Sequence, residues 1–153
     1  MKRMPGLAAR LGTGVALSAA ALVLLAACAS SAPSDQERAA WAQWGSDAIA
    51  ANGVGVGGVF ATDASSEGVT ETYPSPQALH AVELRCIGTD RAQFTLSYTG
   101  TGESTTVTQD IVCHDGGLLT PIAIPTAVGE LTAFTADATS PDGEGYWVAL
   151  PQG

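Results

Sequence analysis

Between Arg91 and Thr99 apolar and polar residues alternate, and this stretch constrains the fold more than any other. Three apolar residues occupy every second position and polar residues stand between them: Phe94, Leu96 and Tyr98 against Gln93, Thr95 and Ser97. Successive side chains of a β-strand point to opposite faces of a sheet. The alternation therefore predicts a strand with one buried face and one solvated face.

Other segments of the chain repeat the pattern less strictly. Their composition predicts further strands over 80–86, 104–113, 128–136 and 144–150. Short polar turns at 99–102 and 138–143 separate neighbouring strands. Such an order of strands is typical of an antiparallel β-sandwich or a small barrel, so we expect a mainly β fold.

One helix is predicted ahead of the strands, over residues 35–51. Ser34 and Glu37 have the spacing of a capping box, and Asn52-Gly53 is a common helix end. Several apolar residues share one face at helical spacing: Trp41, Trp44, Ala48 and Ile49. The next segment, VGVGGVF at 54–60, fits a strand or a glycine-rich loop, and because no helix follows it, a nucleotide site is not indicated.

The first 27 residues have the layout of a secretion signal. Lys2, Arg3 and Arg10 precede an apolar run at 11–25, and small residues follow it. This order is typical of signal peptides that are removed from the mature protein. The alternative is an uncleaved anchor, but the run is short for about 30 Å of hydrocarbon.

The signal ends in Leu25-Ala26-Ala27-Cys28, which resembles the lipobox of bacterial lipoproteins. The resemblance implies cleavage before Cys28 and a diacylglycerol on its sulfur. Two acyl chains, with fatty acids such as palmitate, suffice for stable anchoring. It further implies a domain at 34–153 that residues 28–33 tether to the extracytoplasmic face of the cell membrane.

Cys86 and Cys113 each end a predicted strand on its apolar face. Val82 and Leu84 share the parity of Cys86, and Ile111 shares that of Cys113. Exported chains fold where disulfides persist, so the simplest pairing is a Cys86–Cys113 bond. The alternative is a metal site.

That metal site would combine both cysteines with His114 and either His80 or Asp115, but no usual zinc-ligand spacing supports it. From Cys86 onward the chain reads Cys-x-Gly, a strand, a glycine-rich turn, a strand, Cys-His-Asp-Gly and a final GYWVAL strand. This order resembles small secreted lipoproteins of actinobacteria. The resemblance implies a β-sandwich, and it implies no particular activity.

The charge of the mature chain limits its partners. Beyond residue 27 the chain keeps three arginines and no lysine against all fifteen acidic residues, a formal charge of −12. Binding to nucleic acid requires Lys and Arg to neutralise phosphates, so nucleic acid is excluded. Anionic lipid does not attract such a domain either. We therefore expect contact with the membrane through the lipid anchor alone.

Motifs for catalysis are absent from the sequence. There is no Gly-x-Ser-x-Gly elbow, and His80 and His114 are the two histidines available as bases. Asp115 is adjacent to His114, so on a strand the two would face opposite ways. We expect neither an enzyme nor a bound cofactor.

Two functions remain. The first is a non-catalytic binding or interaction module, in which exposed aromatic residues receive a glycan, a peptide or an envelope protein. The candidate aromatic residues are Trp41, Trp44, Tyr146 and Trp147. The second is a structural or accessory envelope lipoprotein without a small ligand. Exposed aromatic side chains would favour the first function, and complete burial would favour the second.

Overall fold

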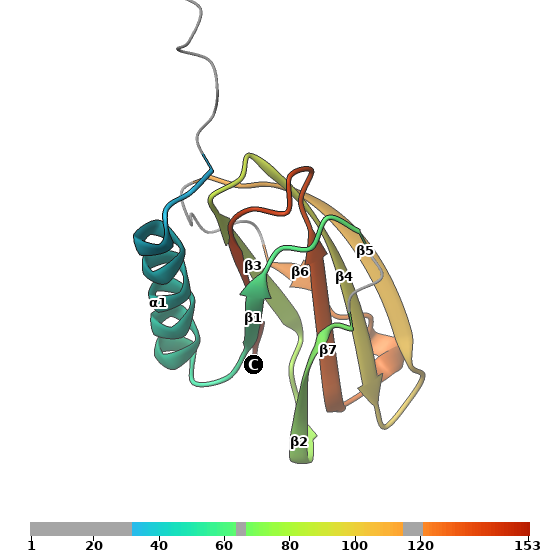
Figure 1. Ribbon diagram of the computed structural model, residues 1–153. Helices are drawn as coiled ribbons and strands as arrows, with labels where there is room; N and C mark the ends of the chain where they lie inside the picture. Colours follow the sequence, from blue (N-terminus) through green and yellow to red (C-terminus); the bar gives the residue numbers. More distant parts are fainter. Residues whose placement is uncertain (1–31, 64–66, 115–120) are drawn as a thin grey trace, which may run out of the picture. The chain divides into compact units, whose positions relative to one another are not determined.

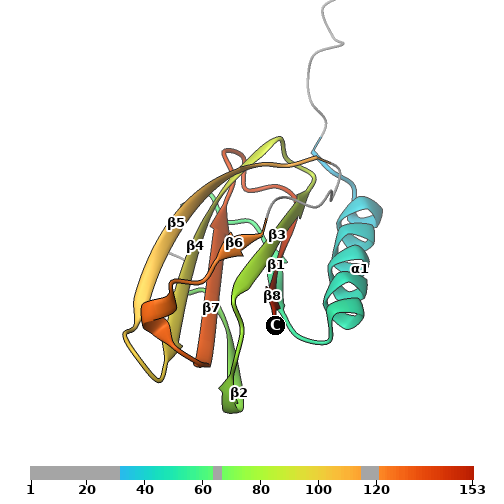
Figure 2. The same ribbon diagram turned by 180° about the vertical axis from the view of Figure 1, so that it is seen from behind.

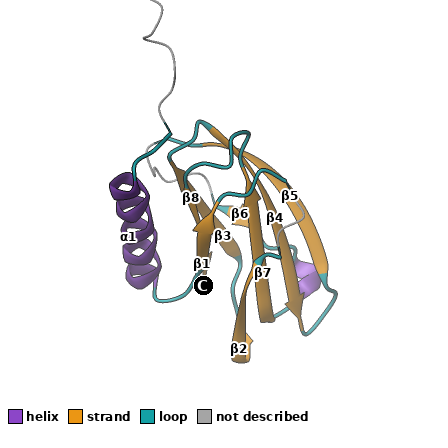
Figure 3. Cartoon of the chain, in the orientation of Figure 1, coloured by secondary structure: helices purple, strands orange, loops and turns teal. Residues whose placement is uncertain are grey.

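The computed structural model describes residues 32–63, 67–114 and 121–153, and Pro33–Gly153 forms one compact unit. This unit contains two four-stranded antiparallel sheets, with strand orders β1-β8-β3-β6 and β2-β7-β4-β5 (Figures 1–3). Buried side chains from both sheets form one core. The predicted mainly β, sandwich-like fold is confirmed. The predicted signal peptide, Cys28 and residues 29–31 of the predicted tether lie outside the described residues.

In the first sheet, β8 occupies a central position. The strands are β1 (Val56–Val59), β8 (Tyr146–Gln152), β3 (Ala81–Ile87) and β6 (Ile122–Ala123). Ala149 of β8 lies opposite Val56 on one side and opposite Leu84 on the other. The VGVGGVF segment thus supplies a strand of the sheet.

In the second sheet, β4 lies between β7 and β5. The strands are β2 (Val69–Gln77), β7 (Leu131–Thr139), β4 (Arg91–Gly100) and β5 (Thr105–Val112). The alternation that predicted β4 is confirmed, because Phe94, Leu96 and Tyr98 are fully buried on its inner face.

Two predicted strands begin two or three residues later than expected. The strand predicted at 128–136 starts at Leu131, because Val128 closes a short 3-10 helix, η1 (Thr126–Val128). The strand predicted at 144–150 starts at Tyr146, because Gly145 has φ 102°, which a β-strand does not accommodate.

Two strands were not predicted. In β2, Pro74 and Pro76 lack the N–H that a strand ladder needs, and the pairing with β7 is irregular between Thr72 and Gln77. Such a strand is tolerated at a sheet edge, where β2 lies. The strand β6 has only two residues, which is too short for a periodic signal.

The helix α1 (Asp35–Asn52) follows its prediction closely. The Ser34 hydroxyl accepts a hydrogen bond from the Glu37 N–H (3.2 Å), and the Ser34 N–H donates to Glu37 Oε2 (2.7 Å). This capping box satisfies two donors that a helix start otherwise leaves free. At the other end the Gly53 N–H donates to the Ile49 carbonyl (2.9 Å).

The helix α1 covers the outer face of the first sheet, over β8 and β1 (Figures 1 and 2). As a result β8 is buried on both faces. Trp147 and Ala149 belong to the core between the sheets. Val148 and Leu150 are also buried, on the face that Ile49 of the helix approaches.

The disulfide between Cys86 and Cys113 is confirmed. Its Cα–Cα distance is 5.3 Å. Cys86 is in β3 and Cys113 directly follows β5, so the bond connects the two sheets. Both side chains are buried.

Candidate binding site

Tyr146 and Trp147 are neighbours on β8 and therefore face opposite sides of the sheet. Trp147 is only 2% exposed, and its ring meets Phe94 edge to face at a centroid distance of 5.9 Å. Its indole Nε1 donates to the Val59 carbonyl (3.2 Å). The prediction of Trp147 as a binding aromatic is wrong, because this side chain fills the core.

Trp41 and Tyr146 line one surface groove, and both are half-buried. We call it the aromatic groove; it has a volume of about 270 Å³ and is lined by Arg38, Trp41, Val59, Gly143, Glu144, Gly145 and Tyr146. Val59 is 72% exposed there. Trp44 is half-buried on α1 and does not line the groove. Two of the four predicted aromatics are thus brought together.

Glycines allow both aromatic rings to lie close to the backbone. A Cβ at Gly45 would overlap the Tyr146 ring, and a Cβ at Gly88 would stand 2.8 Å from Trp41 Cζ2. Gly45 is the buried residue of α1. The helix can therefore approach β8 closely, which sets one wall of the aromatic groove.

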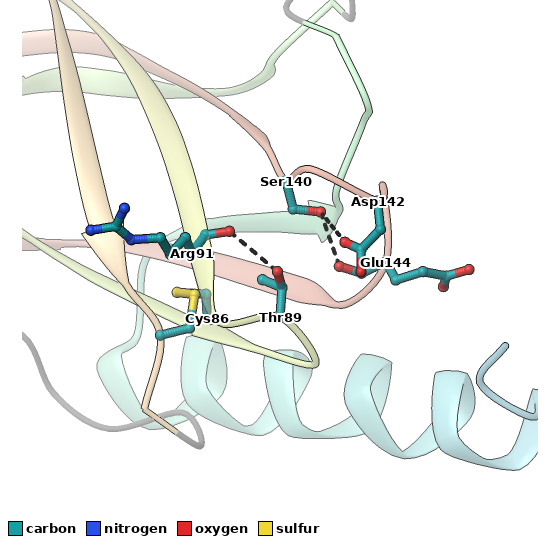
Figure 4. The surroundings of a disulfide bond; sticks show 7 residues. Cys86, Thr89, Arg91, Ser140, Asp142 and Glu144 are labelled. Atoms are coloured by element: carbon teal, nitrogen blue, oxygen red, sulfur yellow. Dashed lines mark hydrogen bonds between the residues drawn. A yellow bond between two sulfur atoms is a disulfide. The ribbon is translucent and has the colours of Figure 1, made fainter. Parts of the chain in front are cut away.

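The turn that connects β7 to β8, residues 140–145, forms the other wall. Ser140 is 3% exposed, and its hydroxyl contacts Asp142 Oδ1 (3.3 Å) and the Glu144 carbonyl (3.2 Å) (Figure 4). The Gly143 N–H donates to the Ser140 carbonyl (3.3 Å). These hydrogen bonds between residues of the turn fix the conformation of the 140–145 turn.

Two more grooves border the same turn, and Arg91 and Pro141 line both. The strand-end groove, about 450 Å³, is further lined by Thr62, Ala92, Gln93, Asp110, Ile111, Val112, Thr139 and Ser140. The disulfide groove, about 610 Å³, is further lined by Gly88, Thr89, Asp90, Cys113 and Asp142. All three grooves therefore gather around the 140–145 turn.

Arg91 differs from the other two arginines of the described residues. Arg38 pairs with Asp35 (3.4 Å) and Glu144 (3.5 Å), and Arg85 pairs with Glu83. The Arg91 guanidinium makes no ion pair or hydrogen bond with any described residue. Arg91 was not among the residues predicted from the sequence to form a site, although its parity with Gln93 places it on the solvated face of β4.

The two histidines lie far apart. His80 precedes β3, whereas His114 follows Cys113, which is bonded to Cys86 near the far end of β3. Cys86 is six positions after His80 along extended chain, or about 20 Å away. Asp115 lies outside the described residues.

The alternative of a thiolate metal site does not fit this geometry. The sulfurs of Cys86 and Cys113 are bonded to each other, so neither is a thiolate ligand. Within residues 32–63, 67–114 and 121–153, no three His, Cys, Asp or Glu side chains are grouped to hold a metal ion.

Among the same described residues, no helix is long and apolar enough to cross a membrane. Comparison of the chain with protein-family models, with curated proteins and with solved structures finds no significant match.

Proposed function

We propose that the chain is a lipoprotein, held by lipidated Cys28 at the extracytoplasmic face of the cell membrane, and that its folded domain is a non-catalytic binding module. The anchor is supported by the order of the first 28 residues, which end in Leu25-Ala26-Ala27-Cys28. The binding module is supported by the grooves around the 140–145 turn.

The observation that carries the proposal is that three surface grooves, lined by Trp41 and Tyr146 or by Arg91, border this turn. Trp41 and Tyr146 offer large, rigid aromatic surface on one side. Arg91 lines the other two grooves, and its guanidinium makes no ion pair or hydrogen bond with any described residue. The volumes of the strand-end and disulfide grooves, about 450 and 610 Å³, fall in the range of small-molecule sites, and the aromatic groove, about 270 Å³, is slightly smaller.

The anchor is tested by the intact mass of the protein extracted from its own membrane. We expect a chain that begins at Cys28 and carries two acyl chains on the thioether lipid. Cys28→Ser cannot form the thioether, so its mass should lack the diacylglycerol whether or not residues 1–27 are removed. A wild-type chain that keeps residues 1–27 and an unmodified Cys28 would instead indicate an uncleaved anchor.

The binding module is tested by photo-crosslinking in intact cells. A photoreactive residue replaces Val59 in the aromatic groove, Thr62 in the strand-end groove, or Thr72, which is exposed on β2 and lines none of the three grooves. We expect discrete adducts from position 59 or 62 and none from position 72. Absence of adducts at both groove positions would favour the alternative, an accessory envelope lipoprotein without a ligand.

A further inference from the structure

The two sheets that the structure describes end in the edge strands β1, β6, β2 and β5, and three of these oppose pairing with a further strand. The strand β1 has four residues with two glycines at its centre, and β6 has only two residues. The strand β2 contains Pro74 and Pro76 and pairs irregularly with β7. In contrast, β5 has eight residues without proline, lysine or arginine, and all eight pair with β4 in one unbroken register. Among the described strands, β5 is therefore the edge best suited to receive another strand.

Every second residue of β5 directs its backbone polar groups away from β4. The Cys113 N–H donates to the Asp90 carbonyl (2.9 Å), so the backbone of Cys113 faces the β4 side. Hydrogen bonding alternates along an antiparallel strand, and the N–H and C=O groups of Thr106, Thr108 and Asp110 therefore point outward. The backbone groups of Thr106 and Thr108 make no hydrogen bond with any described residue outside this ladder. An extended strand can add to such an edge.

The side chains along this edge leave its backbone accessible. The Thr106 hydroxyl lies 2.8 Å from the Ser97 hydroxyl, and Asp110 accepts from Gln93 Nε2 (3.1 Å). Both partners belong to β4, so these contacts draw the two side chains away from the outer edge. Asp110 is the one charged residue of β5, and threonine is favoured in strands.

A second copy of the chain fits this edge when the two β5 strands run antiparallel about a two-fold axis at Thr108. Thr106 of each copy then lies opposite Asp110 of the other. The two Asp110 residues are four positions apart along the strands, about 13 Å, which exceeds the screening length of about 8 Å at physiological salt. A register with Asp110 opposite Thr108 would bring the two carboxylates to about 7 Å and is disfavoured.

The position of α1 agrees with this symmetry. The two-fold axis of an antiparallel strand pair stands perpendicular to the sheet, so both copies present the same face on the same side. The helix α1 covers the outer face of the sheet that does not contain β5 (Figures 1 and 2). Both α1 helices, which the predicted tethers precede, would then lie on one side of the joined sheet. Two lipid anchors can therefore enter one membrane.

The membrane also compensates for the small size of the interface. Pairing along one strand buries less than the roughly 1,200 Å² of a typical stable complex in solution. Two copies that are anchored in one membrane meet at a higher effective concentration than free copies do. A single-strand interface is therefore better suited to anchored chains than to free ones.

We propose that two copies of the chain associate at the membrane through β5, antiparallel and with Thr108 on the two-fold axis. The β2-β7-β4-β5 sheets of the two copies then form one continuous sheet. The inference goes beyond the binding module, because β5 offers a surface for a second copy. It rests on the proposed lipid anchor, which gives the two copies a shared orientation.

The experiment uses the full lipidated chain in its own membrane and introduces one free cysteine. Cys28 carries the lipid and Cys86 is bonded to Cys113, so no other thiol is free. In Thr108→Cys the two Cα atoms across the axis would be about 5.5 Å apart, within the range of disulfides. We expect oxidation with copper phenanthroline to give a disulfide-linked dimer. Thr72→Cys, exposed on the edge strand β2, is the matched control and is expected to stay monomeric.

Further variants test the register. Thr106→Cys and Asp110→Cys chains are expected to cross-link when both are made in the same cells, and neither is expected to cross-link alone. Adding Thr108→Lys to both chains puts two like charges on the axis and should lower this yield about three- to fivefold. Thr72→Lys makes the same change in charge and should leave the yield unchanged. Thermal unfolding of each variant checks that it folds.

Three results would overturn the proposal. Equal dimer yields from Thr108→Cys and Thr72→Cys would indicate random collision in the membrane. A disulfide between Thr108→Cys and a different protein would assign the β5 edge to that partner. A Thr108→Cys chain that stays monomeric while its mass shows the diacylglycerol on Cys28 would rule out the dimer and leave the anchor standing. A wild-type chain without lipid on Cys28 would instead remove the anchor itself, and with it the shared orientation.

Discussion

Cys86 of β3 is bonded to Cys113, the residue that follows β5, so one covalent bond joins the ends of two strands in opposite sheets. The bond lies beside the candidate binding site, because Cys113 lines the disulfide groove together with Arg91. The disulfide is therefore placed to hold the start of β4 and the end of β5 close to β3 of the other sheet.

The first prediction concerns this bond. The two cysteines are 27 positions apart, and on the chain-entropy model a loop of that length stabilises the fold by about 3.5 kcal/mol. We expect the double variant Cys86→Ala/Cys113→Ala to lose about that much free energy of unfolding in urea. Reductant should lower the midpoint of the wild type and leave the double variant unchanged. An unchanged midpoint in the double variant would contradict the prediction.

The second prediction concerns the packing of α1. In Gly45→Ala the new methyl group overlaps the Tyr146 ring. Overpacking costs about 1–3 kcal/mol, which outweighs the gain of up to about 1 kcal/mol in helix propensity. We expect a net loss of stability in thermal unfolding. Ser46→Ala, at the adjacent exposed position, is the control and should change stability little. A more stable Gly45→Ala would show that Tyr146 is free to move.

The third prediction concerns the capping box at the start of α1. Ser34→Ala removes the hydroxyl that accepts from the Glu37 N–H, at a cost of about 1 kcal/mol. Hydrogen bonds from the Ser34 backbone and hydroxyl lower the pKa of Glu37 below 4.5. Because the pKa of Glu37 is lowered in the folded chain, the stabilisation by its ionised carboxylate is complete above pH 4.5. It is lost as the pH falls through the pKa of Glu37 in the folded chain.

Glu37→Gln separates the charge from the hydrogen bond. We expect the wild type to be more stable than Glu37→Gln at pH 7 and to lose this advantage at pH 3, as measured by urea unfolding at both values. A difference that stays constant with pH would contradict the lowered pKa of Glu37.

The fourth prediction concerns a hydroxyl in the core. Tyr98 is fully buried, and its hydroxyl makes no hydrogen bond with any described residue. Burial raises its pKa from 10 to about 12. The folded chain thus keeps this proton to a higher pH than the unfolded chain, so stability is complete below pH 10 and falls between pH 10 and 12, by about 2–3 kcal/mol.

Tyr98→Phe removes this titration. At pH 7 we expect its stability to equal or exceed that of the wild type, because an unpaired buried hydroxyl is unfavourable. Between pH 10 and 12 the stability of Tyr98→Phe should fall less steeply than that of the wild type. The fall that remains includes the titration of Tyr73, because burial and the nearby Glu71 also raise the pKa of Tyr73 to about 12. A parallel fall in both proteins would rule out Tyr98 as a source of the alkaline transition.

Strand and helix prediction succeeded where local pattern and tertiary packing agree. The alternation at β4 is visible because the strand has one core face and one solvated face. The capping box at Ser34 and Glu37 is local, so it needs no partner from elsewhere in the chain. The strand β2 was missed because Pro74 and Pro76 oppose strand pairing, and its place at a sheet edge tolerates them.

The candidate site was predicted only in part. Tyr146 and Trp147 look equivalent in the sequence, yet one lies in a groove and the other in the core, because α1 covers the face of β8 opposite to the core. Arg91 could not be singled out, since nothing in the neighbouring sequence tells whether a carboxylate from another element pairs with it.

The sequence by itself determined the capped helix, the strand periodicity of β4 and the two cysteines that face inward at strand ends, because each depends on residues close together in the chain. Only the tertiary structure decided that Trp41 meets Tyr146 in one groove and that Arg91, which pairs with no described residue, lines two grooves beside the 140–145 turn. These relations depend on how the sheets and the helix pack, because packing decides which residues that are distant in the chain meet and which, such as Arg91, meet no partner among the described residues.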